Sequence, residues 1–215
     1  MDIKKFKGAI FDLDGTLLDS MNVWEDVDKE FFRRRNLDVP PEYIEEIKNM
    51  HLAAAAVYTK EKYHIEDSPE DIVKEWLSLC NEAYLNDVAL KEGAYLFLEK
   101  LHNNGIKMAF ATASEKEVCE APLKKHGIFR FFSASAYVSE INIDKTHPDI
   151  YLLAAKRLGL KASECIVFED IIDAIKSAKK GNFTVCGVYD PNSAKDEEII
   201  RNTADYYIKS FKELL

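Results

Sequence analysis

Two aspartates near the start of the chain, Asp12 and Asp14, have the type and spacing best suited to chemistry. They follow the short apolar run 8–11, which predicts a strand buried on both faces of a parallel sheet. Sheets of this kind bind ligands at the carboxyl ends of their strands. Both side chains can turn to one side, and Gly15 lets the backbone bend sharply behind them. Such a pair allows one carboxylate to attack while the other moves protons.

A solvated acidic turn or a calcium loop is the alternative interpretation, because short Asp-x-Asp-Gly fragments are common. The EF-hand pattern requires a third acidic or amide residue before its glycine and a glutamate that closes the loop. In this sequence Gly15 comes too early, and Val23 occupies the closing position. Calcium is therefore disfavoured, and the catalytic interpretation is preferred to the solvated turn.

The composition allows a sizeable core and argues against some partners. The chain has 215 residues, of which 47% are apolar, and a formal net charge of −9. Acidic and basic residues are mixed along the chain, so nucleic acid and anionic membranes are not expected as partners. The four cysteines are widely spaced, as is typical of reduced thiols. With no membrane-length apolar run and no signal-peptide pattern, we expect a cytoplasmic protein. We also expect it to be a monomer.

The expected elements fall into two patterns. The segment 23–86 indicates helices without an intervening strand, at 23–35, 42–48, 53–63 and 69–85. On either side, strands at 107–111, 165–168, 184–188 and 206–208 alternate with helices at 94–103, 116–125, 148–158 and 174–180. We therefore predict an α/β protein with a Rossmann-like doubly wound parallel sheet and an inserted all-helical domain. The sheet domain would comprise 1–17 and 89–215, and the helical domain 18–88.

Two other predicted strands also end in polar residues. Thr112 follows the strand at 107–111, and Glu169 and Asp170 follow the strand at 165–168. In a parallel sheet these ends face one crevice. Ser114 and Glu117 form a capping-box pattern that starts a helix, and a hydroxyl beside a helix N-terminus suits a phosphate group. A threonine at a strand end is by itself usually only a turn residue, so Thr112 gains significance from the acids nearby.

Lys145 supplies a cation at the same edge. It lies in the loop before Pro148, which fits the first turn of a helix. A single loop lysine is normally solvated. Here, however, three carboxylates and an anionic ligand in one crevice would require a fixed positive charge, and the sequence places no other lysine or arginine there.

Together these residues resemble the haloacid dehalogenase superfamily, in its branch of β-phosphoglucomutase-like phosphatases with a helical cap. The resemblance covers the whole chain, with a cap-sized insertion between the first two motifs. The four motifs occur in the family's order, as Asp12-Leu13-Asp14-Gly15-Thr16, Thr112, Lys145 and Glu169-Asp170. Dehalogenase members lack an acid at the position of Asp14, so this chain resembles the phosphoryl-transfer members.

The resemblance implies a role for each matching residue. Asp12 would be the nucleophile that forms an aspartyl-phosphate, and Asp14 would be the general acid and then the general base. Thr112, Ala113 and Lys145 would hold the transferring phosphoryl group.

The resemblance also implies a bound Mg²⁺. Its ligands would be the side chains of Asp12 and Asp170 and the backbone carbonyl of Asp14, with Glu169 coordinating directly or lying close by. Carboxylate and carbonyl oxygens are the ligands that Mg²⁺ prefers.

The sequence departs from the family pattern in two places. After Glu169-Asp170 the family usually has a serine and then a glycine, where this chain has Ile171 and Ala174. The β-phosphoglucomutases also have a histidine after the first motif and an arginine early in the cap. This chain has Trp24 and the segment 48–52 there, which disfavours a mutase.

The expected function is therefore a Mg²⁺-dependent phosphomonoesterase that hydrolyses a small phosphorylated metabolite, of the sugar phosphate or nucleotide class, through an aspartyl-phosphate. A β-phosphoglucomutase-like sugar-phosphate mutase is the alternative. A phosphate-binding regulatory protein without turnover is a further alternative, because the fourth motif is altered.

Overall fold

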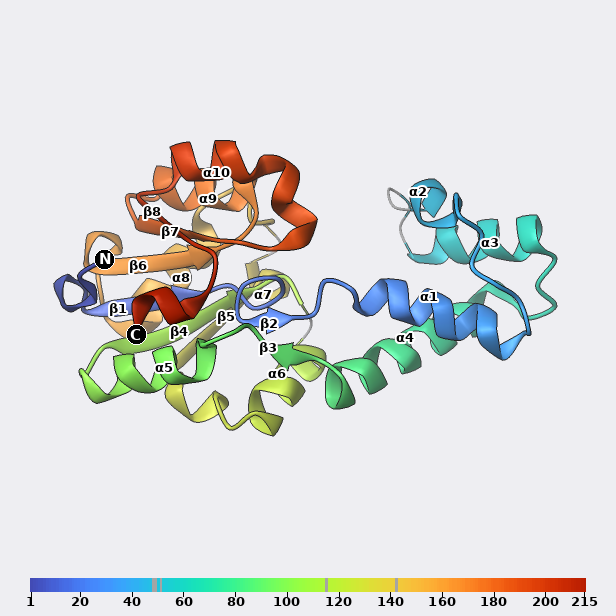
Figure 1. The fold of residues 1–215 in the computed structure, drawn as a ribbon, viewed down its shortest axis with the longest axis horizontal. Helices are drawn as coiled ribbons and strands as arrows, with labels where there is room; N and C mark the ends of the chain where they lie inside the picture. The colour runs from blue at the N-terminus through green and yellow to red at the C-terminus, as the bar shows by residue number, and fades with distance from the viewer. Residues whose placement is uncertain (48–49, 51, 115, 142) are drawn as a thin grey trace. The chain divides into compact units, whose positions relative to one another are not determined.

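The computed structural model describes residues 1–47, 50, 52–114, 116–141 and 143–215. The chain divides into two compact units, shown in Figure 1. One comprises Met1–Met21 and Val88–Leu215 and contains a mixed set of strands and helices. The other comprises Asn22–Asp87 and is helical.

The α/β unit is built on a parallel sheet whose strands, within the described residues, lie in the order β5-β4-β1-β6-β7-β8. β1 lies between β4 and β6, with Ile10 opposite Ala109 and Val167. This order confirms the predicted doubly wound, Rossmann-like sheet. The strands are β1 (Gly8–Phe11), β4 (Lys107–Thr112), β5 (Ala134–Tyr137), β6 (Cys165–Glu169), β7 (Thr184–Val188) and β8 (Tyr206–Ile208).

Helices cover both faces of this sheet (Figure 1). One face packs against apolar residues of α8 (Asp149–Leu158), α9 (Ile172–Lys180) and α10 (Glu197–Thr203). The opposite face carries an aromatic cluster in which Phe11 and Phe168 stack with ring centroids 4.7 Å apart. Phe97 of α5 (Ala94–Asn103) and Phe211 complete this cluster. The remaining helices of the unit are α6 (Lys116–Lys125) and α7 (Val138–Ile141).

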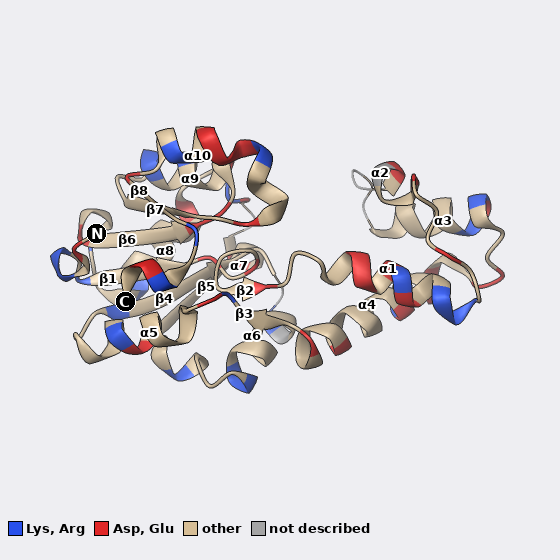
Figure 2. Ribbon diagram, in the orientation of Figure 1, with Lys and Arg blue, Asp and Glu red and all other residues tan. Residues whose placement is uncertain are grey.

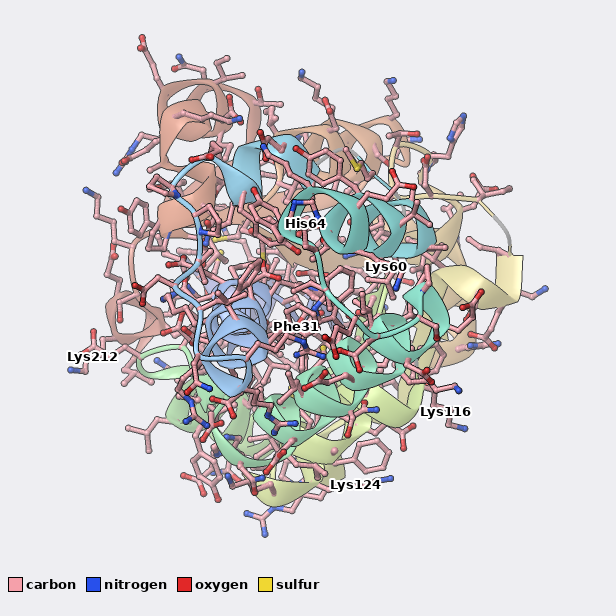
Figure 3. All side chains as sticks on the ribbon, turned by 90° about the vertical axis from the view of Figure 1, so that its right-hand side faces the viewer. Phe31, Lys60, His64, Lys116, Lys124 and Lys212 are labelled. Carbon is pink, nitrogen blue, oxygen red and sulfur yellow. The ribbon has the colours of Figure 1, made fainter. Side chains whose placement is uncertain are left out.

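The helical unit has its own core. Its helices are α1 (Val23–Arg34), α2 (Tyr43–Ile47), α3 (Leu52–Tyr63) and α4 (Pro69–Asn86). Ser68 caps α4 by accepting a hydrogen bond from the Asp71 N–H, and the proline that follows it suits the first turn. Phe31 of α1, labelled in Figure 3, contacts Trp76 of α4 with ring centroids 5.5 Å apart. The predicted end of the second helix, at Lys48, lies outside the described residues.

A short antiparallel pair of strands stands where the chain leaves the α/β unit and returns to it. β2 (Leu18–Asp19) pairs with β3 (Ala89–Leu90). The next residue, Lys91, donates its N–H to the Leu17 carbonyl at 2.9 Å and its ammonium group to the fully buried Asp190 at 2.5 Å. The sequence did not predict this pair, because two-residue strands carry no periodic signal.

Charged residues are distributed over both units. Figure 2 shows basic and acidic segments interspersed along the helices of each. None of the helices in the described part of the chain combines the length and apolar character needed to cross a membrane. The four cysteines are buried, and none is in a disulfide.

Asp28 of α1 is an acidic residue inside the helical unit. It is only 7% exposed, and burial, followed by the nearby charge of Glu25, raises the pKa of its carboxyl group to about 7. Burial raises the pKa of Tyr43 as well, with a smaller contribution from Asp28. The ionised form of Asp28 is therefore disfavoured in the folded unit.

We expect Asp28→Asn to stabilise the protein increasingly as the pH rises. A carboxyl whose folded pKa is raised favours folding below its unfolded pKa of 3.8, and this stability is lost as the pH rises to about 7. The advantage of the variant over wild type should therefore grow by about 2–3 kcal/mol between pH 5 and pH 8. Urea unfolding at several pH values measures it. Asp26→Asn, on the exposed side of α1, is the matched control, and parallel pH profiles for wild type and Asp28→Asn would contradict the prediction.

Candidate active site

Three neighbouring strands bring polar residues to the carboxyl edge of the sheet. Asp12 follows β1, Thr112 ends β4, and Glu169 ends β6 with Asp170 directly after it. The Asp12 N–H donates to the Phe168 carbonyl at 3.0 Å, which continues the pairing of β1 with β6 beyond the strand end. The parallel register therefore sets the position of Asp12 beside the acids of β6.

Lys145 lies among these acids. Its ammonium group donates to Asp12 Oδ1 and, at 3.1 Å, to Glu169 Oε1. The lysine side chain is 14% exposed, compared with 8% for Asp12 and 1% for Glu169. Lys145 is thus a largely buried cation held by two carboxylates.

Both oxygens of Glu169 are engaged within the protein. Besides Lys145, Oε1 accepts a hydrogen bond from the Tyr151 hydroxyl at 2.9 Å, and Oε2 accepts one from the Asp170 N–H at 2.9 Å. Tyr151 is fully buried on α8. Glu169 therefore fixes the lysine and the backbone of Asp170. Tyr151 was not predicted as a site residue from the sequence, although a buried tyrosine hydroxyl usually requires a partner.

The carboxylates of Asp12, Glu169 and Asp170 offer oxygen atoms that all lie within 4.8 Å of one another. Asp170 also accepts a hydrogen bond from the Thr16 hydroxyl at 3.0 Å. Gly15 has a φ of +82°, and a Cβ there would lie 2.5 Å from Asp170 Oδ2, so a glycine allows this close approach. A hard divalent cation such as Mg²⁺ prefers carboxylate and carbonyl oxygens, and this donor set fits it.

The electrostatics of the cluster point to an excess of negative charge. Burial, and then the charge of Glu169, raise the pKa of Asp12 to about 7, although Lys145 opposes this shift. Burial and Glu169 also raise the pKa of Asp170 well above its usual value. Burial lowers the pKa of Lys145, but Asp12 and Glu169 outweigh it and hold that pKa above its usual value. One ammonium group does not balance three buried carboxyls, and a divalent cation would do so.

Asp14 is half-buried and is held by two hydroxyl groups. The Ser20 hydroxyl donates a hydrogen bond to Asp14 Oδ1, and the Ser114 hydroxyl donates one to Asp14 Oδ2, both at 2.5 Å. The capping-box pattern predicted Ser114 at the start of a helix but gave no sign of its contact with Asp14. The other residue of that pattern, Glu117, has a side chain that lies outside the described part of the structure. Ser20, six residues after Asp14, was not predicted as part of the site either.

Thr112 and Ala113 lie at the end of β4. Thr112 is 1% exposed, and its hydroxyl accepts the Ser114 N–H at 3.0 Å. Ala113 follows it and is exposed. Because Phe110 is paired with Phe11, the end of β4 lies within about two residues of the level of Asp12. The structure thus places all the predicted site residues at one edge of the sheet.

Known proteins resemble this chain over nearly its full length. A Drosophila melanogaster protein named "Probable pseudouridine-5'-phosphatase" is 26% identical, over 97% of this chain and 95% of its own. Hexitol phosphatase A of Escherichia coli is 29% identical, over 97% of this chain and 93% of its own. The crystal structure of a β-phosphoglucomutase from Clostridium difficile superposes with a TM-score of 0.67, covering 98% of this chain and 93% of that one at 23% identity, a likeness of fold.

The chain also matches the profile of a protein family. Residues 9–188 match the profile described as "Haloacid dehalogenase-like hydrolase", a span that runs from β1 through β7 and includes every site residue described above. The order of the motifs predicted this family. The chain belongs to the haloacid dehalogenase-like hydrolases.

Proposed function

We propose that this protein is a Mg²⁺-dependent phosphomonoesterase that hydrolyses a small phosphorylated metabolite through an aspartyl-phosphate on Asp12. The observation that carries the proposal is the buried cluster of Asp12, Glu169 and Asp170 around Lys145. The phosphatase names of two relatives support the reaction, and the compounds in those names support a sugar phosphate or nucleotide-class substrate.

Asp12 is the proposed nucleophile. Lys145 holds its Oδ1 and so fixes the orientation of the carboxylate toward phosphorus. A phosphate monoester repels a carboxylate and reacts extremely slowly without help, so that enzymes accelerate such hydrolyses by up to about 10²¹-fold. Lys145 lowers this repulsion and, with Thr112 and the backbone of Ala113, would hold the oxygens of the transferring group.

The metal site would be formed by the side chains of Asp12 and Asp170 and the backbone carbonyl of Asp14. When bound, Mg²⁺ would supply positive charge that offsets both the buried carboxylates and the phosphoryl oxygens. Glu169 has both oxygens engaged, so we assign it to holding Lys145 and the Asp170 backbone in place.

Asp14 is the proposed general acid and base. It would give a proton to the leaving oxygen as the ester bond breaks and later take one from the water that attacks the aspartyl-phosphate. Splitting hydrolysis into these two steps regenerates Asp12 and releases inorganic phosphate.

The altered fourth motif does not argue against turnover. Ile171 is 47% exposed and Ala174 is buried in α9, while Asp170 and Glu169 keep their mutual contact. A regulatory protein without turnover is therefore disfavoured. We assign chemistry to the predicted sheet domain, 1–17 and 89–215, and a role in substrate choice to the predicted helical cap, 18–88.

Asp12→Asn is expected to lower kcat by about 10⁴- to 10⁶-fold, because an amide is a poor nucleophile. Asp14→Asn should lower kcat by about 10²- to 10⁴-fold and let an aspartyl-phosphate form from an ester with a good leaving group. Phosphate release and acid-quenched labelling of the protein measure these effects, with circular dichroism as the control for folding. Wild-type turnover in a folded Asp12→Asn variant would exclude this nucleophile.

Chelation is expected to abolish phosphate release, and added Mg²⁺ should restore it, with Ca²⁺ a poor substitute because of its larger size and looser coordination. Calorimetry should detect Mg²⁺ binding to wild type and much weaker binding to Asp170→Asn. Exposed Asp173→Asn is the matched control and should bind normally. Activity that survives chelation would remove the metal from the proposal.

Water, rather than a second phosphate ester, should accept the phosphoryl group. A mutase needs a fixed cation for the distal phosphate, most readily an arginine, and the sequence from 39 to 63 contains none. The test supplies β-glucose 1-phosphate with catalytic glucose 1,6-bisphosphate and follows inorganic phosphate and glucose 6-phosphate. Fast isomerisation with negligible phosphate release would establish the mutase instead.

A further inference from the structure

Asp14 is held by hydroxyl groups from two separate parts of the α/β unit. Ser20 lies next to β2, and Ser114 lies just beyond β4, at a sequence separation of 100 residues from Asp14. Each serine donates to a different oxygen of the carboxylate. The carboxylate therefore cannot turn about its Cβ–Cγ bond without breaking both hydrogen bonds.

The geometry of these hydrogen bonds suits an acid and base. Each carboxylate oxygen has a second lone pair, so Asp14 can still meet a proton from substrate or water. A serine hydroxyl can also accept a hydrogen bond, so the same two contacts can form when Asp14 carries a proton.

Ser114 also links Asp14 to the end of β4. Its N–H donates to the hydroxyl of Thr112, which is the last residue of the strand and is buried. The orientation of Asp14 is therefore tied to the side chain that ends β4 as well as to its own loop.

We propose that Ser114, together with Ser20, is a positioning residue for Asp14 that fixes the direction in which Asp14 delivers a proton to the leaving oxygen. This inference rests on the proposed function, in which Asp14 is the general acid. Orientation has large effects in such steps, because a displacement of about 1 Å costs about 10²-fold in rate.

Other roles for the Ser114 hydroxyl predict different results. A serine that bound the phosphate would, when removed, weaken the binding of every phosphate ester and of inorganic phosphate. A serine that only capped α6 would, when removed, cost about 1 kcal/mol of stability without distinguishing one ester from another. A serine that positions the acid matters most when the leaving oxygen is strongly basic and needs the proton.

The test compares Ser114→Ala, Ser114→Thr and Ser20→Ala with wild type. Ser133→Ala, which removes a hydroxyl bonded to the Met108 carbonyl in the same unit, is the matched control. For each variant kcat and KM are measured with an alkyl phosphate and with p-nitrophenyl phosphate, whose leaving group needs little protonation, together with Ki for inorganic phosphate.

Ser114→Ala should lower kcat for the alkyl ester by about 10- to 100-fold and for the nitrophenyl ester by less than about 3-fold. Ser20→Ala should show the same selectivity, Ser114→Thr should recover the alkyl rate, and Ser133→Ala should match wild type. Ki for phosphate should stay unchanged. Equal losses with both esters, or a raised Ki, would overturn the inference.

A structural measurement separates this inference from the proposed function. Crystal structures without ligand should show one Asp14 rotamer in wild type and a different or additional rotamer in Ser114→Ala. An unchanged single rotamer in Ser114→Ala would refute positioning, whatever the kinetics. A wild-type protein that hydrolysed neither ester would refute the proposed function, while the two structures would still decide whether Ser114 positions Asp14.

Discussion

The site depends on one electrostatic constraint, because three carboxyl groups and one ammonium group share a buried space at the edge of the sheet. Asp12, Glu169 and Asp170 are all buried, and Lys145 contacts two of them. Unbalanced charge in such a space costs several kcal/mol, so each group must be held by hydrogen bonds in a fixed arrangement. The hydroxyl of Tyr151 and the register of the strands provide that arrangement. Replacing buried charges by apolar groups is often neutral or stabilising, so stability alone does not account for this arrangement.

Most strands of the sheet could be predicted because their sequences agree with their surroundings. The limits of β7 and β8 match the prediction to the residue, and both strands are rich in β-branched or aromatic residues. β5 was missed because three of its four residues are alanine or serine, which give a weak strand signal, and its pairing with β4 is a tertiary contact. α10 was missed for a similar reason, since Glu197–Thr203 is a short, largely polar helix with one fully buried apolar residue, Ile200.

The charged residues of the site were easier to locate than the groups that hold them. The end of a parallel strand is a defined place, so Asp12, Glu169 and Asp170 can be assigned to it from the sequence. The contacts of Tyr151 and Ser114 join residues that are distant along the chain. Serine is common in turns and helix caps, so its type alone does not reveal which partner its hydroxyl chooses. Such contacts depend on the folded arrangement of several elements.

The pairing of β2 with β3 has an evolutionary consequence. The ends of the helical insertion are neighbours, and Lys91 ties the returning strand to Leu17 and Asp190 of the sheet unit. Closing a loop between ends that are already joined costs little more as the loop lengthens, about 0.6 kcal/mol for each doubling. The inserted segment can therefore be lengthened, shortened or exchanged during evolution while the strand order of the sheet stays the same. The helical unit and the sheet unit can thus diverge at different rates within one gene.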